Sequence, residues 1–322
     1  LYFKQNFEIH EALLEESLPS TLEVKKFFNK FLNIKENFSS DIWRDKKFHL
    51  SDSCLDEINK LIFPIQFNKI SYDIRSHAIK EFISSDLRKG HGIFLTPDEV
   101  VKTIIKVINP SYKDKVLDPA CGSGTFLIEF LNYINPTKKC EVFGFEKNPR
   151  MLLLSELNLN HYKTVKFHKN LTDSLQNSSS NNKFDLVVTN PPFGVSIDSK
   201  NYNFQSFKTC CDKNGTPLKK QSSEIVFIEK CFQMLKPGGT LAIVIPKSIA
   251  TNSSQGLSRR VLGEYGYIYS IINLPPETFA TTGTQTTTIV LFAKKFKNIG
   301  MIHFDTHADC APQGLTGFKY DH

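Results

Sequence analysis

The chain has 322 residues, of which 40% are hydrophobic and 23% are charged. This composition gives no sign of disorder and is that of a soluble protein with room for one large α/β domain and a smaller one. The longest apolar runs, such as 241–245 and 289–293, have the length of strands, so no membrane span or signal peptide is predicted. The net charge of +7 suits a polyanionic partner without identifying one. The seven cysteines include no Cys-x-x-Cys pair, which indicates reduced thiols in a cytoplasm.

Residues 1–90 are predicted to form a helical domain, because apolar residues recur at helical spacing in four segments separated by polar breaks. These segments are 8–16, 22–31, 54–61 and 73–88. A bundle that packs on the rest of the chain is the simplest interpretation, and a partner-binding surface is the functional one. The Glu-x-Lys pair at Glu23 and Lys25 would suit a nuclease, but no aspartate on an upstream strand accompanies it. The chain begins at Leu1 without a methionine, so we expect it to be part of a longer protein.

A second domain is predicted over residues 91–322, and its first helix, 98–108, has a recognisable start. Thr96 can cap this helix with its hydroxyl oxygen, and the restricted φ of Pro97 suits the first helical position. A structural role at the helix start therefore accounts for both residues.

The segment 115–126 reads Lys-Val-Leu-Asp-Pro-Ala-Cys-Gly-Ser-Gly-Thr-Phe, a short apolar strand that runs into a glycine-containing turn and then a helix. Asp118 marks the end of the strand. Gly122 and Gly124 allow a tight turn and a close approach of the backbone to a ligand. The spacing is neither the Gly-x-Gly-x-x-Gly of dinucleotide sites nor a P-loop, although the strand–turn–helix order is typical of nucleotide-like ligands.

Two further predicted strands end in polar residues. The strand 141–146 ends in Glu146, whose carboxylate can accept hydrogen bonds from both ribose hydroxyls of an adenosine. The strand 184–189 runs into Asn-Pro-Pro-Phe at 190–193. Each feature alone is weak evidence, but the glycine turn, the acid and the Asn-Pro-Pro-Phe turn occur together.

With these motifs in this order, the chain resembles the amino-group DNA methyltransferases that use S-adenosylmethionine to methylate adenine at its exocyclic nitrogen. The run Asp-Pro-Ala-Cys-Gly-Ser-Gly-Thr-Phe at 118–126 looks most like that of the modification subunits of type I restriction-modification systems. The resemblance covers roughly residues 92–305. It implies a class I methyltransferase fold, which is α/β and Rossmann-like with a seven-stranded mixed sheet, and a helical N-terminal domain before it.

The resemblance also implies a site for S-adenosylmethionine. Thr96 and Pro97 stand where the family has Phe-Thr-Pro, in a loop over the methionine end of the cofactor, although this chain has Phe-Leu-Thr-Pro. Glu146 would bind the ribose, and Asp173 would accept from the adenine amino group or else cap a turn. The implied cofactor-binding residues are Thr96, Pro97, Asp118, Ala120, Gly122, Gly124, Thr125, Phe126, Glu146, Asp173 and Asn190.

The predicted catalytic residues are Asn190, Pro191, Pro192 and Phe193. The adenine amine is a poor nucleophile because its lone pair is delocalised into the ring. The Asn190 side-chain oxygen and a main-chain carbonyl beside Pro191 would each accept one amine proton, which turns the lone pair toward the sulfonium methyl group. The prolines would stiffen the turn. Phe193 would stack on the base, and Phe279 would lie against its other face or simply pack beneath the sheet.

Chemistry on this nitrogen requires the adenine to be flipped out of the duplex. Residues 195–222, rich in lysine and aromatic residues, are predicted to form a long polar loop that contacts DNA or closes over the base, or else a mobile surface loop. Further predicted elements are helices over 148–162, 224–235 and 254–265, a turn at 236–239, and strands over 165–168, 240–246, 267–274 and 286–293, of which the last two form an antiparallel hairpin.

Four residues near the end of the sequence, His303, Asp305, His307 and Asp309, alternate in a way that would place them on one face of a strand and could bind zinc. An exposed strand with alternating polar residues explains the pattern more simply. Methyl transfer needs no metal, so no metal site is predicted.

By resemblance, the expected partners are DNA, a specificity subunit and a restriction subunit, in a bacterial or archaeal cytoplasm. A separate specificity subunit is expected because the residues after the last core strand are too few for a target-recognition domain. Two alternatives stay open. One is methylation of a protein glutamine or an RNA base by the same Asn-Pro-Pro-Phe chemistry, and the other is a non-catalytic subunit that binds DNA or a restriction partner.

Overall fold

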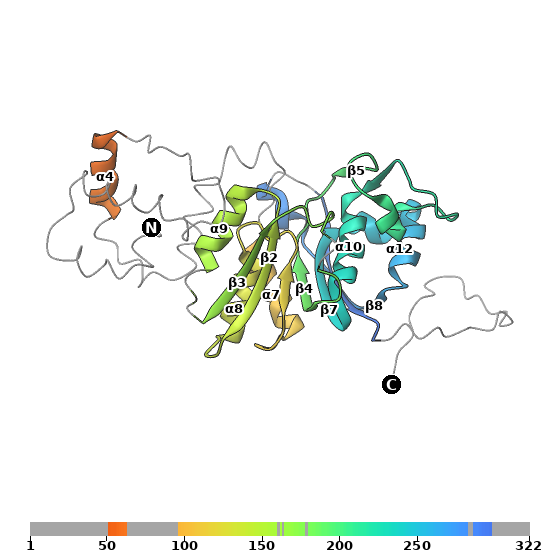
Figure 1. Ribbon diagram of the computed structural model, residues 1–322, viewed down its shortest axis with the longest axis horizontal. Coiled ribbons are helices and arrows are strands. Elements are labelled where there is room, and N and C mark those ends of the chain that lie inside the picture. Colours follow the sequence, from red (N-terminus) through yellow and green to blue (C-terminus); the bar gives the residue numbers. More distant parts are fainter. Residues whose placement is uncertain are drawn as a thin grey trace. The chain divides into compact units, whose positions relative to one another are not determined.

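The computed structural model of the protein describes residues 51–62, 96–159, 162, 164–177, 180–282 and 286–297 (Figure 1). The chain divides into two units, Leu1–Ser84 and Ser85–His322. In the first unit the described element is the helix α4 (Asp52–Ile62), which confirms the helix predicted over 54–61. The other helices predicted before residue 90, and the four residues considered for zinc, lie outside the described residues. The helical N-terminal domain therefore stays a prediction.

The second unit contains a seven-stranded sheet. Its strands are β1 (Val116–Asp118), β2 (Cys140–Glu146), β3 (Val165–Leu171), β4 (Phe184–Thr189), β7 (Leu235–Pro246), β8 (Gly266–Asn273) and β9 (Thr288–Lys295). Their order across the sheet is β3-β2-β1-β4-β7-β9-β8 (Figure 1). β9 runs antiparallel to both of its neighbours, and the other pairs are parallel. The predicted mixed α/β sheet and its closing antiparallel hairpin are confirmed.

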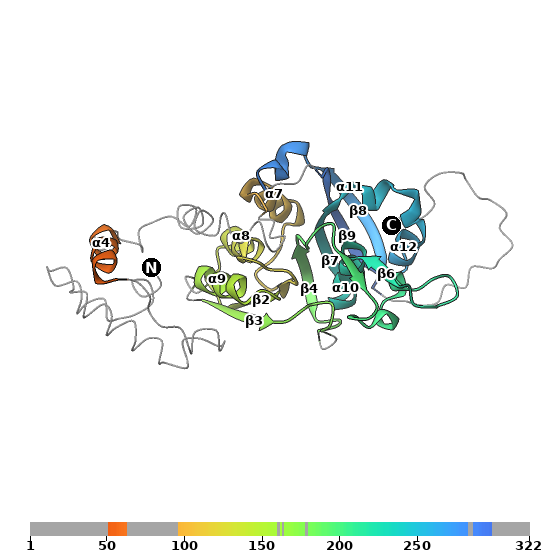
Figure 2. The same ribbon diagram turned by 90° about the horizontal axis from the view of Figure 1, so that it is seen from above.

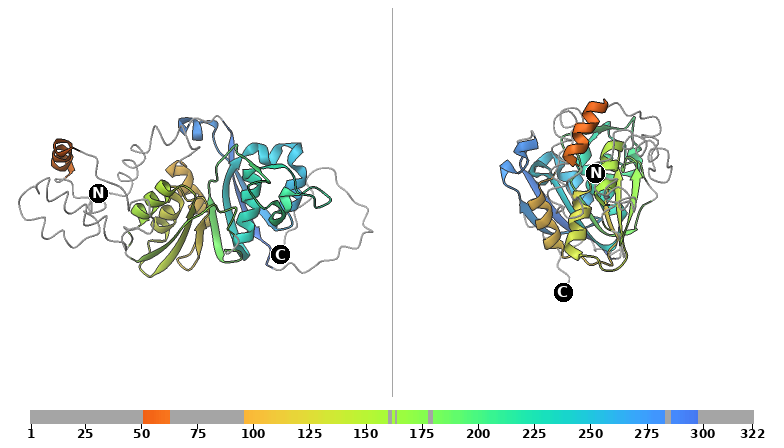
Figure 3. Two further views of the ribbon diagram at one scale, coloured as in Figure 1. Left: turned by 45° about the horizontal axis from the view of Figure 1, so that its top comes forward. Right: turned by 90° about the vertical axis from the view of Figure 1, so that its left-hand side faces the viewer.

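Helices cover both faces of this sheet (Figure 2). One face carries α7 (Asp98–Ile108), α8 (Thr125–Ile134) and α9 (Pro149–Leu159), and the other carries α10 (Ser223–Met234) and α12 (Gly256–Leu262). Figure 3 shows the same layers from two further directions. The helix predicted over 254–265 is shorter than expected, because residues 253–255 form a 3₁₀ turn and α12 ends before Gly263. Among the described residues no helix is both long enough and apolar enough to span a bilayer.

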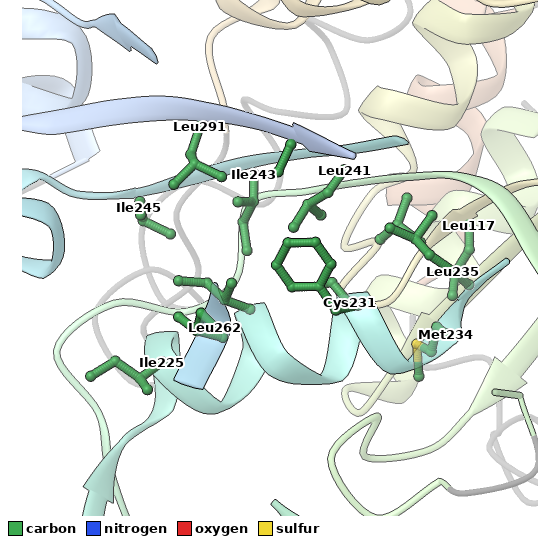
Figure 4. Close-up of a cluster of buried hydrophobic side chains, with 14 of the residues drawn as sticks. Leu117, Ile225, Cys231, Met234, Leu235, Leu241, Ile243, Ile245, Leu262 and Leu291 are labelled. Atoms are coloured by element: carbon green, nitrogen blue, oxygen red, sulfur yellow. The ribbon is translucent and has the colours of Figure 1, made fainter. Parts of the chain in front are cut away.

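Burial on both faces of the sheet explains why residues 241–245 of β7 are all apolar. Leu241, Ile243 and Ile245 of β7 pack toward α10 (Figure 4). Ala242 and Val244 are buried as well, because helices also cover the opposite face. Burial of one such large aliphatic side chain stabilises the fold by about 1.5–3 kcal/mol. This core anchors β4 and α10, and both α10 and the turn after β4 contribute to the candidate site described below.

Residues 196–222 form a small packed lobe, so the prediction of a long polar loop was wrong. The lobe contains a two-stranded antiparallel ribbon, β5 (Ser196–Asp198) and β6 (Lys220–Ser222), and two 3₁₀ turns, η4 (Phe204–Ser206) and η5 (Lys208–Cys210). Phe204, Phe207 and Cys210 are buried against α10. These apolar residues recur every third position, which matches the 3₁₀ period, but the polar residues around them hide the pattern.

The predicted turn at 236–239 is instead a bulge inside β7. The pairing between β4 and β7 shifts register from Phe184–Leu235 to Leu186–Thr240, which accommodates the extra residues of β7. Gly238 has a φ of 79°, a value that glycine adopts at little cost. The Lys-Pro-Gly-Gly sequence therefore bends a continuous strand and does not separate a helix from a strand.

Candidate functional site

A cavity of about 720 Å³ lies at the carboxyl ends of the parallel strands. Its lining includes Pro119 after β1, Glu146 at the end of β2, Thr172 after β3 and Asn190 after β4. Parallel strands end at one edge of a sheet, so loops far apart in the sequence converge there. The volume lies within the roughly 300–1,000 Å³ typical of small-molecule sites.

The glycine turn forms one wall of this cavity. Asp118 Oδ1 accepts a hydrogen bond from Ala120 N at 3.0 Å, which holds the chain as it leaves β1. Gly122 and Gly124 have φ values of 51° and 85°, in the left-handed region that favours glycine. A Cβ on Gly124 would also lie 3.1 Å from Ser155 Cβ of α9, so the absent side chain lets α8 and α9 approach each other. The turn thus has the tight geometry expected from its two glycines.

Glu146 binds the same turn from the neighbouring strand. Its Oε2 accepts from Gly122 N at 2.9 Å and its Oε1 from Asn148 N at 2.7 Å. Burial raises the pKa of the Glu146 carboxyl, and the backbone donors partly offset this effect. A carboxylate has about four lone-pair directions, so each oxygen can accept a further hydrogen bond from a ligand. Two hydroxyls of a diol would suit this pair of oxygens.

Asp173, in the segment after β3, connects that segment to Lys147 after β2 and to Tyr202 of the lobe at another part of the cavity. Its Oδ1 accepts from Leu175 N at 3.1 Å, which makes it a turn cap. Its Oδ2 accepts from Lys147 Nζ at 3.0 Å and from the Tyr202 hydroxyl at 2.8 Å. The side chain of Lys147 is 72% exposed and that of Asp173 13%. Tyr202 therefore connects the lobe to the segment after β3, and both Tyr202 and Asp173 line the cavity.

Asn190 has an unusual environment for a buried amide. Its Nδ2 donates to Thr96 Oγ1 at 2.9 Å. Its Oδ1 is buried and has no hydrogen-bond partner among the described residues. An unsatisfied buried acceptor costs roughly 1–3 kcal/mol, so such atoms are uncommon unless a ligand completes them.

The contact with Asn190 replaces the helix-capping role predicted for Thr96. Pro97 occupies the N-cap position of α7, no side chain caps that helix, and Asp98 is its first residue. The Thr96 hydroxyl faces Asn190 instead. The helix predicted over 98–108 is nevertheless confirmed.

Phe193 and Phe279 lie side by side although 86 positions separate them in the sequence. Their ring centroids are 6.0 Å apart with an interplanar angle of 81°, an edge-to-face contact. Phe279 is almost fully buried. Since the edge of one ring meets the face of the other, a base could lie between them only if one ring moved.

The cavity includes some of the predicted cofactor-binding residues and not others. Those that line it are Ala120, Gly122, Glu146, Asp173 and Asn190, together with the predicted catalytic residues Pro191 and Pro192. Those that do not line it are Thr96, Pro97, Asp118, Gly124, Thr125 and Phe126. Asp118 and Phe126 are buried beneath the turn, and burial raises the pKa of Asp118 to about 7. Asp118 and Gly124 shape the turn from below without reaching the cavity.

Sequence reasoning missed other residues that line the cavity, including Lys147, Met151, Ser223 and Phe227, and placed Tyr202 only within the segment 195–222 expected to contact DNA or close over the base. The position of Lys147 directly after Glu146 was an available signal. No local pattern indicates Tyr202 or Phe227, because the packing of the lobe on α10 brings them to the site. Within the part of the chain that the structure describes, no group of three or more His, Cys, Asp and Glu residues could hold a metal ion.

Solved structures resemble the protein closely in fold. A type I restriction-modification methyltransferase subunit from Streptococcus thermophilus matches with a TM-score of 0.68 and 20% identity, over 91% of this chain and 71% of that one. A class I S-adenosylmethionine-dependent methyltransferase from Listeria monocytogenes matches with a TM-score of 0.63 and 19% identity, over 92% and 91%. The fold is therefore the class I methyltransferase fold.

The sequence identifies the family within this fold. The N-6 DNA Methylase family matches residues 73–312, and the chain belongs to it. It is 26% identical over 260 residues to the type I restriction enzyme MpnII methylase subunit of Mycoplasma pneumoniae, covering 74% of this chain and 48% of that protein. It is 24% identical over 294 residues to the MjaVII methylase subunit of Methanocaldococcus jannaschii, covering 84% and 49%. The chain thus spans about half the length of these relatives.

Proposed function

We propose that the chain transfers a methyl group from S-adenosylmethionine to the exocyclic N6 of a flipped adenine in DNA, as the modification subunit of a restriction-modification system. The observation that carries this proposal is the buried, unpartnered Oδ1 of Asn190 in the lining of a cavity that also contains Glu146. An exocyclic amine is a donor that would satisfy this atom. Membership of the N-6 DNA Methylase family supports the same substrate.

The cavity residues fit S-adenosylmethionine. Glu146 would accept hydrogen bonds from the ribose hydroxyls, and Asp173 would accept one from the adenine amino group. Lys147 and Tyr202 already donate to Asp173 Oδ2, so the exposed Lys147 ammonium is the group that would give way. Bound there, the cofactor would supply an electrophilic methyl group on a sulfonium centre.

Asn190 would then polarise the target amine. Its Oδ1 would accept a hydrogen bond from one amine N–H, and a main-chain carbonyl beside Pro191 would accept one from the other, which directs the nitrogen lone pair toward in-line attack. After the methyl group is transferred, the nitrogen would release one proton to solvent. Thr96 accepts from Asn190 Nδ2 and thereby holds the amide with its oxygen in the required orientation. No strong general base is required, so positioning and polarisation account for the catalysis. Flipping the base out of a duplex would cost a few kcal/mol, which binding to the protein must offset.

We further propose DNA, a specificity subunit and a restriction subunit as partners, in the cytoplasm of a bacterium or archaeon. The support is that the relatives are named methylase subunits of type I restriction enzymes. A structure concerned with the assembly of a type I restriction-modification system also matches the fold, with a TM-score of 0.63 over 91% of this chain.

The test is methyl transfer from labelled S-adenosylmethionine to unmethylated DNA, with and without the specificity subunit, followed by digestion to nucleosides. We expect label in N6-methyladenine that depends on the partner. Asn190→Ala should lower the transfer rate by about 100- to 1,000-fold, the usual effect of losing one such polar group. Asn132→Ala, a change at an exposed position of α8, should leave the rate unchanged.

Other outcomes would redirect the assignment. Label in N6-methyladenine without the partner would mean that this chain recognises its own DNA sequence. Label on an RNA base or a protein glutamine would show that the same chemistry acts on another substrate. Cofactor binding without transfer to any of these would identify a non-catalytic subunit.

A further inference from the structure

The turn that follows β4, residues 190–195, is held at its far end by the first residues of α10. Three hydrogen bonds join the two segments: Gly194 N donates to Glu224 Oε1 at 2.6 Å, Ser223 N donates to Val195 O at 2.9 Å, and Ser223 Oγ donates to Pro192 O at 3.3 Å. These bonds span about thirty positions of sequence. The two-stranded ribbon β5–β6 brings the chain back to the turn, since Ser196 pairs with Ser222 directly beside these bonds.

Glu224 is a buried acid, and both of its carboxylate oxygens accept hydrogen bonds from other residues of the chain. The residue is only 4% exposed, and its second oxygen lies within hydrogen-bond distance of the hydroxyls of Ser222 and Ser223. It lies in the first turn of α10, where the helix dipole favours a negative charge. A buried carboxylate is stable only where donors bind it, because an unpaired buried charge is unfavourable.

Gly194 is the residue of the turn whose own structure restrains the backbone least. Pro191 and Pro192 restrict the backbone before Phe193. Gly194 comes directly after, with a φ of 69°, and glycine is the residue with the greatest backbone freedom. A Cβ built on Gly194 would have no atom within 4 Å, so packing of neighbouring side chains does not restrain this position. The hydrogen bond to Glu224 supplies the restraint that the glycine lacks.

We propose that Glu224 is a positioning residue for methyl transfer, which acts through the Gly194 amide and, together with Ser223, sets the shape of the turn that carries Asn190 and Phe193. Glu224 is absent from the lining of the cavity, so it reaches the site only through the turn. This inference rests on the proposed function.

Glu229 provides a matched control on the same helix. It is also fully buried, and its carboxylate accepts hydrogen bonds from Lys208 N, Thr209 N and the Tyr265 hydroxyl. None of these donors belongs to the turn after β4. Glu229→Ala therefore removes a buried acid from α10 without touching residues 190–195.

The experiment compares Glu224→Ala, Glu224→Gln and Glu229→Ala in the full chain with its specificity subunit. It measures single-turnover methyl transfer at saturating DNA and cofactor, the Kd for S-adenosylhomocysteine and the melting temperature. Glu224→Ala should lower the transfer rate by about 10- to 100-fold, the scale expected for misplacement of a reacting group by about 1 Å, with an unchanged Kd. Glu224→Gln keeps an acceptor for the Gly194 amide and should restore most of the rate. Glu229→Ala should lower the melting temperature and leave the rate per folded molecule unchanged.

Three results would overturn the inference while leaving the proposed function intact: a wild-type rate in Glu224→Ala, a folded Glu224→Gln variant as slow as the alanine variant, or an equal loss of rate in Glu229→Ala. If Glu224→Ala does not fold, Glu224→Gln and Ser223→Ala decide. The first should then stay active. The second, which removes the Ser223 hydroxyl from both Pro192 O and Glu224 Oε2 but keeps the bond from Gly194 N to Glu224, should lower the rate with little change in melting temperature. Absence of transfer by the wild-type complex would overturn the proposed function, and this inference with it.

Discussion

Replacement of Glu146 by glutamine tests the proposed cofactor site directly, because both oxygens of this side chain already have defined partners. Oε1 accepts from Asn148 N and Oε2 from Gly122 N. A glutamine retains one acceptor oxygen and places an amide NH₂ group against the other backbone donor. The variant would lose one hydrogen bond within the turn and one to the ribose.

The size of the effect follows from these losses. Hydrogen bonds to a charged group contribute about 1.5–3 kcal/mol each, and the retained oxygen preserves part of the interaction. We expect binding of S-adenosylmethionine to weaken by about 2–4 kcal/mol, which corresponds to an increase in Kd of about 30- to 1,000-fold. Burial raises the pKa of Glu146, so a neutral amide also removes a desolvation cost. The free energy of unfolding should therefore change much less than the binding energy.

Isothermal titration calorimetry with S-adenosylmethionine, together with thermal unfolding of the same samples, would measure both quantities. Glu141→Gln is the matched control, since Glu141 lies on the same strand, is partly exposed and contacts His168 Nε2 at 3.1 Å. It should bind the cofactor as the wild type does. A folded Glu146→Gln protein with a wild-type Kd would refute the assignment of the ribose to Glu146. Equal weakening in both variants would point to a general effect of charge.

Two further predictions concern the glycine turn. Burial raises the pKa of Asp118 from 3.8 to about 7, so the native state keeps a proton that the unfolded chain has lost. The contribution of Asp118 should therefore lower the free energy of unfolding as the pH rises from about 4 to about 7, by up to 1.4 kcal/mol per pH unit. Asp118→Asn, which still accepts from Ala120 N, should remove this pH dependence when urea unfolding is measured at several pH values. If the free energy of unfolding varied with pH equally in both proteins, Asp118 would not be its source. Gly124→Ala should cost about 1–3 kcal/mol more than Gly215→Ala, because both have φ above 80° but only Gly124 has Ser155 within contact distance. Equal losses would mean that backbone strain alone matters.

Much of the second unit was predictable from local patterns. The helix over Asp98–Ile108 agrees with its prediction at both ends, since its apolar residues follow a single helical stripe. The strand before the Asn-Pro-Pro-Phe turn was also located correctly, because a short run of buried residues ends at a proline pair. The lobe at 196–222 was not predictable in this way. Its buried residues Phe204, Phe207 and Cys210 lie in or between two short 3₁₀ turns, polar residues surround them in the sequence, and their burial depends on α10.

The candidate site was likewise predictable only in part from the sequence. The sequence alone determined that Glu146 and Asn190 follow apolar strands, and parallel strands must end at one edge, so their convergence in one cavity required only the correct fold class. The tertiary structure decided which groups hold them. Thr96 faces Asn190 across 94 positions, Tyr202 reaches Asp173, and Glu224 binds the Gly194 amide. These contacts depend on how helices and the lobe pack around the sheet. No periodicity or spacing in the sequence encodes that packing.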